Sequence, residues 1–317
     1  MFEVTHKNSL EKISQSISQD FIDDYTNLFL ESLDIKQSSK STYKRQLKEF
    51  LVWFKNQNQN NLDRQDLLHY KEFLQNDKSL SSLTISGYLT VVRKFFQWLE
   101  SVKIYPNIAT GIKGPKRRKG FRKDCLTVEQ TKILLNSIDR STLTGKRDFA
   151  MLNLMIRTGL RGIEILRANR EDISRQSGET VLFIHGKGRD DKDEIVLLTQ
   201  SVIEPINQYL IARKNVKNRD PIFASHCTKN WGKRLTTRSI SRIVKNRLKD
   251  INLDDPRLTA HSLRHTAITL SLLAGATTQE VRAMARHSDV NTTLIYAHNI
   301  NRIKQAPEKK IDAFLED

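Results

Sequence analysis

Hydrophobic side chains recur every three or four residues through the first third of the chain, which is the period of an amphipathic helix. Four such segments follow one another: FIDDYTNLFLESL, SSKSTYKRQLKEFLVWF, RQDLLHYKEFLQ and SLSSLTISGYLTVVRKFFQWLESV. Their expected apolar stripes include Tyr43, Leu47, Phe50, Leu51 and Phe54 in the second segment, and Leu89, Val92, Phe96 and Leu99 in the fourth. Serines and threonines that can cap a helix open both of these segments. We therefore expect a compact helical domain over residues 21–105, preceded by a polar leader of residues 1–20.

The pattern breaks over residues 106–124, PNIATGIKGPKRRKGFRKD, where prolines, glycines and a cluster of Lys and Arg replace the apolar stripe. Prolines and glycines interrupt regular structure, so this stretch predicts an extended linker. Its cations suit a path along a phosphate backbone, and the alternative is a merely solvated hinge.

Residues 125–300 form the second predicted domain, and most of it again has a helical period. The pair Thr127 and Gln130 has the spacing of a capping box before a helix. A helix, a break at Thr158–Gly159 and a second helix are expected in GKRDFAMLNLMIRTGLRGIEILRANREDI. The runs 181–185 and 194–198 are strand-like and predict a hairpin. Further helices follow, then a tail over residues 301–317. The predicted fold class is mainly α with a small β-sheet, an α+β second domain after the helical bundle.

The net charge of the chain indicates a class of binding partner. The chain has 53 Lys+Arg against 36 Asp+Glu, so 53 − 36 gives a net charge of +17. Such an excess favours a polyanion, above all nucleic acid, with an anionic membrane surface or a plain solvated surface as alternatives. The longest apolar runs, such as FAMLNLMI, are far shorter than a membrane span, and the N-terminus resembles no signal peptide. Cys125 and Cys227 lack ligand spacing, which excludes a thiolate zinc site and fits a reducing cytoplasm.

The stretch LTAHSLRHTAI places His261 and His265 four residues apart, on one face of a helix. That spacing is used to hold zinc, but a metalloprotease helix needs a Glu that is missing here, and Arg264 would repel a dication. The second interpretation pairs His261 with Arg264 as a phosphate site, because a guanidinium fork matches phosphate oxygens. Packing is the third interpretation, and for His265 it is favoured because an apolar face follows.

Four more candidates stand in other motifs. Arg161 lies at the break TGLRG, Lys187 between the glycines of GKG, His287 in RHSD, and Tyr296 in LIYAH. Each residue alone is weak evidence for a catalytic site, because a single Arg usually forms a surface ion pair and a single Tyr usually packs against apolar neighbours. Their ordered combination is informative.

Together, TGLRGIEIL, FIHGKG, HSLRHTAIT and RHSDVNTTLIYAH resemble the catalytic domain of the tyrosine recombinases, the phage integrase family. The preceding bundle resembles the core-binding domain of Xer-like and transposon- or plasmid-borne integrases, so the similarity extends from about residue 20 to residue 300. It implies site-specific cutting and rejoining of duplex DNA through a 3′-phosphotyrosine, with no metal and no cofactor. A DNA-binding regulator that no longer cuts and a type IB topoisomerase-like relaxing enzyme are the alternatives.

The resemblance also implies a role for each matching residue. Arg161 and Arg264 would hold the scissile phosphate, and Lys187 would protonate the leaving 5′ oxygen. His261 would assist proton transfer at the tyrosine, His287 would contact the phosphate, and Tyr296 would be the nucleophile. Two departures from the family pattern bear on the site. Ala285-Arg286 replaces the usual Leu-Gly, which adds a cation close to the site, and the acidic hairpin loop 186–194 has Glu194 where an Arg is common.

Partner contacts are expected on both domains. The candidate DNA-binding side chains are Lys40, Thr42, Lys44, Thr84, Ser86, Arg93, Lys116, Arg117, Arg118, Arg238 and Arg242. Most would contact phosphates, which position a protein rather than specify a sequence. In the tail, Ile311, Phe314 and Leu315 form a small apolar face. The resemblance implies that such a tail docks in trans, giving a homo-tetramer on two paired sites. Accessory DNA-bending proteins are a further open class of partner, and a bacterial cytoplasm with association to the nucleoid is the expected location.

Overall fold

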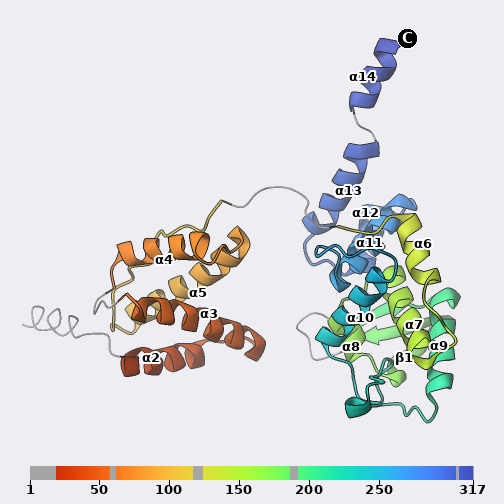
Figure 1. Cartoon of the computed structure of the whole chain (residues 1–317), viewed down its shortest axis with the longest axis horizontal. Helices are drawn as coiled ribbons and strands as arrows, with labels where there is room; N and C mark the ends of the chain where they lie inside the picture. The colour runs from red at the N-terminus through yellow and green to blue at the C-terminus, as the bar shows by residue number, and fades with distance from the viewer. Residues whose placement is uncertain (1–18, 58–61, 117–123, 186–191, 305–306, 317) are drawn as a thin grey trace, which may run out of the picture. The chain divides into compact units, whose positions relative to one another are not determined.

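The computed structural model describes residues 19–57, 62–116, 124–185, 192–304 and 307–316 (Figure 1). The chain divides into two compact units, residues 1–119 and 120–317. Each unit has a hydrophobic core of its own. The two are therefore described separately.

The first unit is the predicted bundle of four helices, α2 (Gln19–Ser32), α3 (Gln37–Lys55), α4 (Arg64–Asn76) and α5 (Ser82–Ser101). The expected stripes are confirmed: Leu47, Phe50, Leu89 and Phe96 are buried, and the ring centroids of Phe50 and Tyr70 lie 5.0 Å apart. Such edge-on aromatic pairs add to the stabilisation from buried area.

The caps of these helices differ from one another. Ser81 caps α5 as expected, because its side chain accepts a hydrogen bond from the Thr84 amide. The predicted cap of α3 is wrong. That helix begins at Gln37, after Lys36, without a side-chain cap. Ser41 and Thr42 lie inside the helix and donate their hydroxyls to carbonyls four residues earlier, which is a common use of hydroxyls within helices.

The chain after α5 stays on the bundle for some distance. Ala109 and Ile112 are buried in its core, and Gly114 lies so close to Ser86 that a Cβ there would come within 2.6 Å of the serine hydroxyl. Part of the segment expected to be an extended linker is therefore packed onto the first unit.

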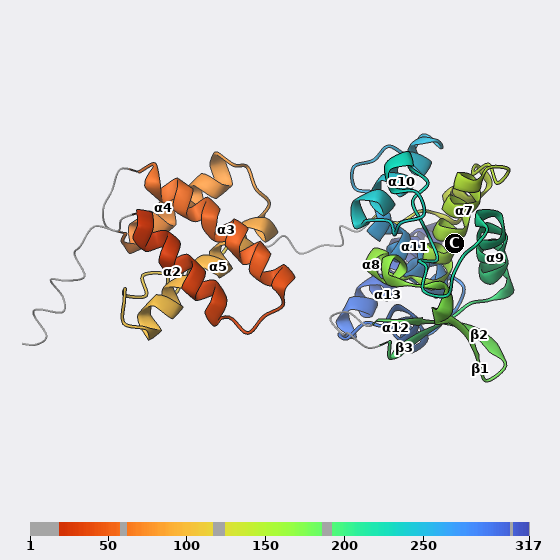
Figure 2. The same ribbon diagram turned by 90° about the horizontal axis from the view of Figure 1, so that it is seen from below.

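The second unit is built around α7 (Leu143–Thr158), which is buried along most of its length. It packs against α9 (Gln200–Arg213) and α11 (Ala260–Leu273), and Figure 2 shows α7 and α9 side by side. Before it, α6 (Val128–Asn136) starts with the predicted capping box of Thr127 and Gln130. The helices α8 (Gly162–Arg167) and α10 (Thr237–Lys249) pack on each other beside this core.

A three-stranded antiparallel sheet of order β1-β2-β3 accompanies these helices. It consists of β1 (Ile173–Gln176), β2 (Glu179–Ile184) and β3 (Glu194–Leu197). The predicted hairpin of β2 and β3 is confirmed, with Leu182 opposite Val196. Strand β1 is not predicted from the sequence, and the helix expected in the stretch up to Ile173 ends already at Arg167. Ser177 and Gly178 both have positive φ, which is the two-residue turn that favours a β-hairpin.

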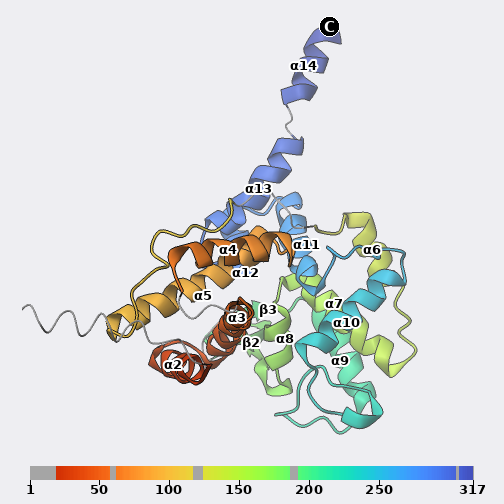
Figure 3. The same ribbon diagram turned by 60° about the vertical axis from the view of Figure 1, so that its left-hand side comes forward.

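Three helices complete the chain: α12 (Thr278–Ala285), α13 (Asn291–Lys304) and α14 (Pro307–Glu316). Within the second unit, α13 packs on α11 and α12, and α14 extends away from the other helices (Figure 3). Among the described residues, no helix combines the length and the apolar character that crossing a membrane requires.

Candidate active site

Tyr296 lies on α13, on the side that faces α11 and α12. Its side chain is only 2% exposed, and it packs in a small apolar cluster with Ile268, Val281 and Ala285. Its Oη is hydrogen-bonded to Nδ1 of His265 on α11. Burial raises the pKa of Tyr296 to about 12, whereas the charge of Arg264 acts in the opposite direction.

The two histidines of HSLRH share one face of α11, as their spacing predicts. Their ring centroids lie 4.5 Å apart. His261 is exposed at the start of the helix, and His265 is buried. The burial of His265 agrees with its interpretation as a packing residue. Its Nδ1 is in addition hydrogen-bonded to the Tyr296 phenol, which the spacing along the sequence does not indicate. Within the described ranges, no group of three or more His, Cys, Asp and Glu side chains could hold a metal ion.

Arg264 is held in one geometry by two backbone carbonyls. Its Nη1 donates to the carbonyl of Gly159 over 2.6 Å, and its Nη2 donates to the carbonyl of Ala285. Gly159 ends α7 with a φ of +64°, a conformation that favours glycine. Burial lowers the pKa of Arg264 to about 10, and Arg161 acts in the same direction. The guanidinium is therefore a fixed cation at neutral pH beside a second arginine.

Arg161 stands at the start of α8 and is positioned by Glu164. The carboxylate accepts hydrogen bonds from the Arg161 backbone amide over 2.7 Å and from its Nη1 over 2.6 Å. Glu164 is 1% exposed, whereas the Arg161 side chain keeps 22% of its surface open. The Nη2 of Arg161 also donates to the carbonyl of Arg286 over 3.3 Å. A buried carboxylate thus orients a partly open guanidinium.

Arg286 is the additional cation that the sequence places close to the site, and it is neutralised there. Its Nη2 lies 3.0 Å from Oε2 of Glu164, and its Nε lies 3.4 Å from Oε2 of Glu194. Its φ is +53°, which strains a residue with a side chain and explains why a glycine suits this turn. The ion pairs connect the turn between α12 and α13 with α8 and with the start of β3.

We expect Arg286→Gly to weaken the reaction without unfolding the protein. Glycine relieves the strained backbone, but Glu164 and Glu194 then lose a charged partner and Glu164 orients Arg161 less firmly. Losing a charged hydrogen bond of about 1–2 kcal/mol predicts a strand-cleavage rate lower by roughly 5- to 30-fold. Single-turnover cleavage measures it, and Arg286→Asn, which tolerates the same φ without a charge, is the matched control. Unchanged rates in both variants would contradict this coupling.

His287 follows Arg286 in the same turn. Its Nδ1 lies 2.8 Å from Oγ1 of Thr293, and Thr293 is fully buried. The ring is thus anchored to α13, and the residue before it supplies the carbonyl that receives Arg161. Lys187 lies outside the described residues, between the end of β2 and the start of β3.

The structure therefore brings five of the six predicted catalytic residues into one region, with Glu164, Arg286 and His265 as additional members. The sequence could have indicated Glu164, because it lies three residues after Arg161. From that position the Glu side chain can reach back to the backbone amide at the start of the helix. Nothing in the sequence reveals the bond between His265 and Tyr296, because it joins two helices that meet only in the folded unit.

The candidate DNA-binding residues differ in how exposed their side chains are. Those with exposed side chains are Thr42, Lys44, Thr84, Arg93, Lys116, Arg238 and Arg242. Lys40 is half-buried with its Nζ 3.4 Å from the carbonyl of Glu31. Ser86 donates its hydroxyl to Ser82 and is covered by Gly114, so it is poorly placed for a contact. Arg117 and Arg118 lie outside the described residues.

Comparisons with known proteins agree with this arrangement. Residues 124–302 match the phage integrase family, and residues 22–103 match the N-terminal SAM-like domain of phage integrases. Tyrosine recombinase XerD of Listeria innocua is 29% identical over 290 residues, which cover 88% of this chain and 94% of that protein. Tyrosine recombinase XerC of Chlamydia caviae is 33% identical over 241 residues, 75% of this chain and 74% of that protein.

Solved structures share the fold. The XerH site-specific recombinase bound to palindromic difH substrate has a TM-score of 0.69 at 21% identity, covering 95% of this chain and 89% of that chain. A lambda integrase dimer bound to a COC′ core site has a TM-score of 0.70 at 15% identity, covering 93% and 81%. The chain belongs to the phage integrase family. It is a tyrosine recombinase, an enzyme of site-specific DNA recombination.

Proposed function

We propose that Tyr296 attacks a phosphodiester of duplex DNA and forms a 3′-phosphotyrosine, with release of a 5′-hydroxyl. The observation that carries this proposal is that the buried Tyr296 phenol lies within the electrostatic influence of the buried Arg264, which is itself influenced by Arg161 of the Arg161–Glu164 pair. Two fixed guanidinium groups can bind the non-bridging oxygens and stabilise the charge that develops on them. The 5′-hydroxyl of another strand then attacks the phosphotyrosine and rejoins the DNA.

In this proposal the protein needs neither nucleotide nor metal ion. The covalent bond to Tyr296 conserves the energy of the phosphodiester, so rejoining requires no external energy source. Arg161, Arg264 and Lys187 supply three positive charges for the pentacoordinate phosphate, and Lys187 protonates the leaving oxygen. His261 and His287 add donors at the same phosphate or at the phenol.

The proposed substrate is a pair of duplex sites, each recognised through contacts of both units. Solved relatives bound to difH substrate and to a core site support double-stranded DNA as the partner. A net charge of +17 fits a binding step driven largely by phosphate contacts. Integration, excision and resolution share this chemistry, and accessory DNA-bending proteins would choose among them.

Two experiments test the proposal. The first incubates the protein with nicked duplexes that carry candidate inverted repeats, sought in the DNA beside its gene, and maps the trapped adduct by proteolysis. A 3′ adduct on the α13 peptide supports the proposal, and the absence of an adduct overturns it. The second places two sites in one plasmid. Exchange between the sites supports a recombinase, whereas relaxation without exchange would support the topoisomerase alternative.

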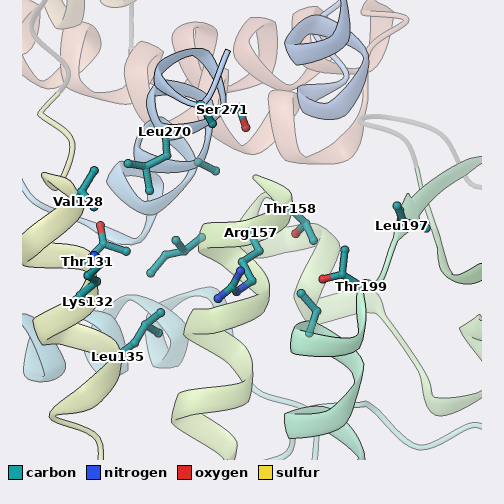
Figure 4. A pocket seen from close by; sticks show the side chains of 14 residues that line it. Val128, Thr131, Lys132, Leu135, Arg157, Thr158, Leu197, Thr199, Leu270 and Ser271 are labelled. Atoms are coloured by element: carbon teal, nitrogen blue, oxygen red, sulfur yellow. The ribbon is translucent and has the colours of Figure 1, made fainter. Parts of the chain in front are cut away.

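We also propose that α14 docks on a second copy of the chain. Ile311, Phe314 and Leu315 are 56%, 82% and 75% exposed, which is unusual for large apolar side chains on one helix face. The same unit carries a pocket of about 420 Å³ between α6, α7 and α11 (Figure 4). Leu135 and Leu270 are among its apolar lining residues, and none of the proposed catalytic residues lines it.

Charges at the pocket and on α14 also suit this docking. Lys132 and Arg157 stand at the pocket, whereas Asp312 and Glu316 flank the apolar face of α14. The apolar lining residues Val128 and Leu197 are 38% and 51% exposed, so an occupant would cover them. Docking of this kind, repeated around two paired sites, would close a tetramer.

We expect Phe314→Asp, or removal of residues 306–317, to stop tetramers from forming on DNA while single sites remain bound. The reciprocal variant Val128→Asp should do the same, because it places a charge at the pocket but suits the first turn of α6. Native mass measurements on paired sites read the stoichiometry. Intact tetramers in all three variants would disprove the docking.

A further inference from the structure

His265 occupies the position from which a base would act on Tyr296. Its Nδ1 contacts the phenolic Oη, the atom that must lose a proton before or as it attacks phosphorus. Both side chains are buried, at 5% and 2% exposure, and their ring centroids lie 5.6 Å apart. The contact is therefore made in the interior and not at the solvent surface.

We propose that His265 takes the proton of Tyr296 during strand cleavage and returns it during rejoining. This inference rests on the proposed function, in which Tyr296 is the nucleophile. It assigns the proton transfer at the phenol to the second histidine of HSLRH, and it leaves His261, which is exposed, closer to solvent and to the DNA.

The environment of the phenol makes a proton acceptor necessary. Burial raises the pKa of Tyr296 to about 12, so at neutral pH only about one molecule in 10⁵ would carry a phenolate unaided. The cation of Arg264 favours the phenolate but cannot accept a proton. A neutral imidazole at hydrogen-bond distance can accept it as the Oη–P bond forms.

Charged and titratable groups surround the pair. Arg264 and His261 come from α11, and Cys125 precedes α6 and acts on Tyr296. Arg161, Glu164 and Arg286 act on Arg264. Of the groups facing the phenol, Arg264 is a donor without an acceptor atom. The ring of His265 is the acceptor that the structure places on Oη.

The step balances in atoms and charge. The Oη–H bond breaks, its proton moves to Nδ1 of His265, the Oη–P bond forms, and the bond from phosphorus to the 5′ oxygen breaks. The leaving oxygen takes its proton from the general acid, which is Lys187 in the proposed function. In the reverse reaction the 5′-hydroxyl attacks phosphorus, and the imidazolium returns its proton to the departing phenol.

The dependence of cleavage on pH tests this role. The matched variants are His265→Asn and His265→Gln, whose amides keep hydrogen-bonding atoms near the ring nitrogens but cannot take up a proton, and His261→Asn is the control. Cleavage of the nicked duplex is measured in single turnovers from pH 6 to 9, below the pKa of about 10 that burial gives Arg264. General base catalysis contributes about 10²–10⁴-fold, so we expect the His265 variants to lose at least about 100-fold near pH 7.5.

The decisive readout is how steeply the cleavage rate rises with pH. The rate of the His265 variants should rise about tenfold per pH unit toward pH 9, because hydroxide must then remove the proton. The wild-type and His261→Asn rates should level off at lower pH. Profiles of the His265 variants parallel to the wild-type profile would overturn the inference, since a merely structural defect lowers the rate equally at every pH.

A second measurement keeps the test independent of whether the His265 variants fold. Fluorinated tyrosine at position 296 of otherwise unchanged protein lowers the pKa of the phenol below that of tyrosine, because fluorine withdraws electron density from the ring. With a proton acceptor in place the rate near pH 7.5 should change less than about threefold, whereas a rise of about tenfold or more would overturn the inference.

The same assay separates two kinds of failure. If wild-type protein forms no adduct, or forms it on a residue other than Tyr296, the proposed function fails and this inference fails with it. If the adduct maps to Tyr296 and the pH profiles are parallel, only the role of His265 is refuted.

Discussion

Tyr296→Phe is expected to form no covalent adduct with a nicked duplex, although it binds the same DNA with wild-type affinity. The substitution removes the one oxygen that attacks phosphorus and leaves the ring in its apolar cluster. Losing a single buried hydrogen bond costs only about 0.5–1.5 kcal/mol of the free energy of unfolding, so the variant should fold. The measurement is adduct formation on denaturing gels, combined with mobility shift for binding.

The matched control for this variant is His265→Asn, which keeps the nucleophile and should still form adduct at high pH. If Tyr296→Phe formed adduct at a rate close to that of wild type, another residue would be the nucleophile. The proposed function would then be refuted. A loss of DNA binding equal to the loss of cleavage would also contradict the expectation, because Tyr296 is buried and has no surface with which to hold DNA.

Arg264→Ala is expected to lower the cleavage rate by about 10³-fold or more, since removal of a single charge-stabilising donor commonly costs about 10²–10³. Here the lost group is a cation, and its side chain also fills space between the carbonyls of Gly159 and Ala285. Burial lowers the pKa of this arginine to about 10, so the charge is present throughout the pH range of an ordinary assay. Single-turnover rates at saturating protein measure the effect.

Two controls sharpen this expectation. Arg175→Ala removes an exposed cation of β1 and should leave cleavage nearly unchanged while DNA binding weakens slightly. Arg264→Lys keeps a charge but lacks the planar fork, so it should recover only part of the activity. A chelator should not change the wild-type rate. A loss of activity with chelator, restored by a divalent cation, would refute the metal-free chemistry proposed for this site.

Much of the fold follows from local patterns. Helical periods predict the bundle and strand-like runs predict the hairpin, because each pattern depends on residues close in sequence. Strand β1 was missed for a related reason: RANREDISRQ has polar residues that suit a helix, and only pairing with β2 stabilises the strand. The burial of Ala109 and Ile112 likewise depends on the bundle that receives them.

The candidate site is likewise predictable only in part from the sequence. Motifs indicated Arg161, Arg264 and Tyr296, because their residue types and order are specific to one kind of chemistry. The bond between His265 and Tyr296 and the ion pairs of Arg286 depend on how α11, α12, α13 and β3 meet. A sequence pattern identifies the donors and acceptors, but the partner that each side chain meets is decided by tertiary packing.

The position of Tyr296 also limits how this enzyme can lose its activity in evolution. The ring is part of the cluster with Ile268, Val281 and Ala285, so truncation to alanine would open a cavity that costs about 3–5 kcal/mol. Phenylalanine fills the same space. Descendants that persist only as DNA-bound proteins should therefore keep an aromatic ring at this position long after the hydroxyl is gone.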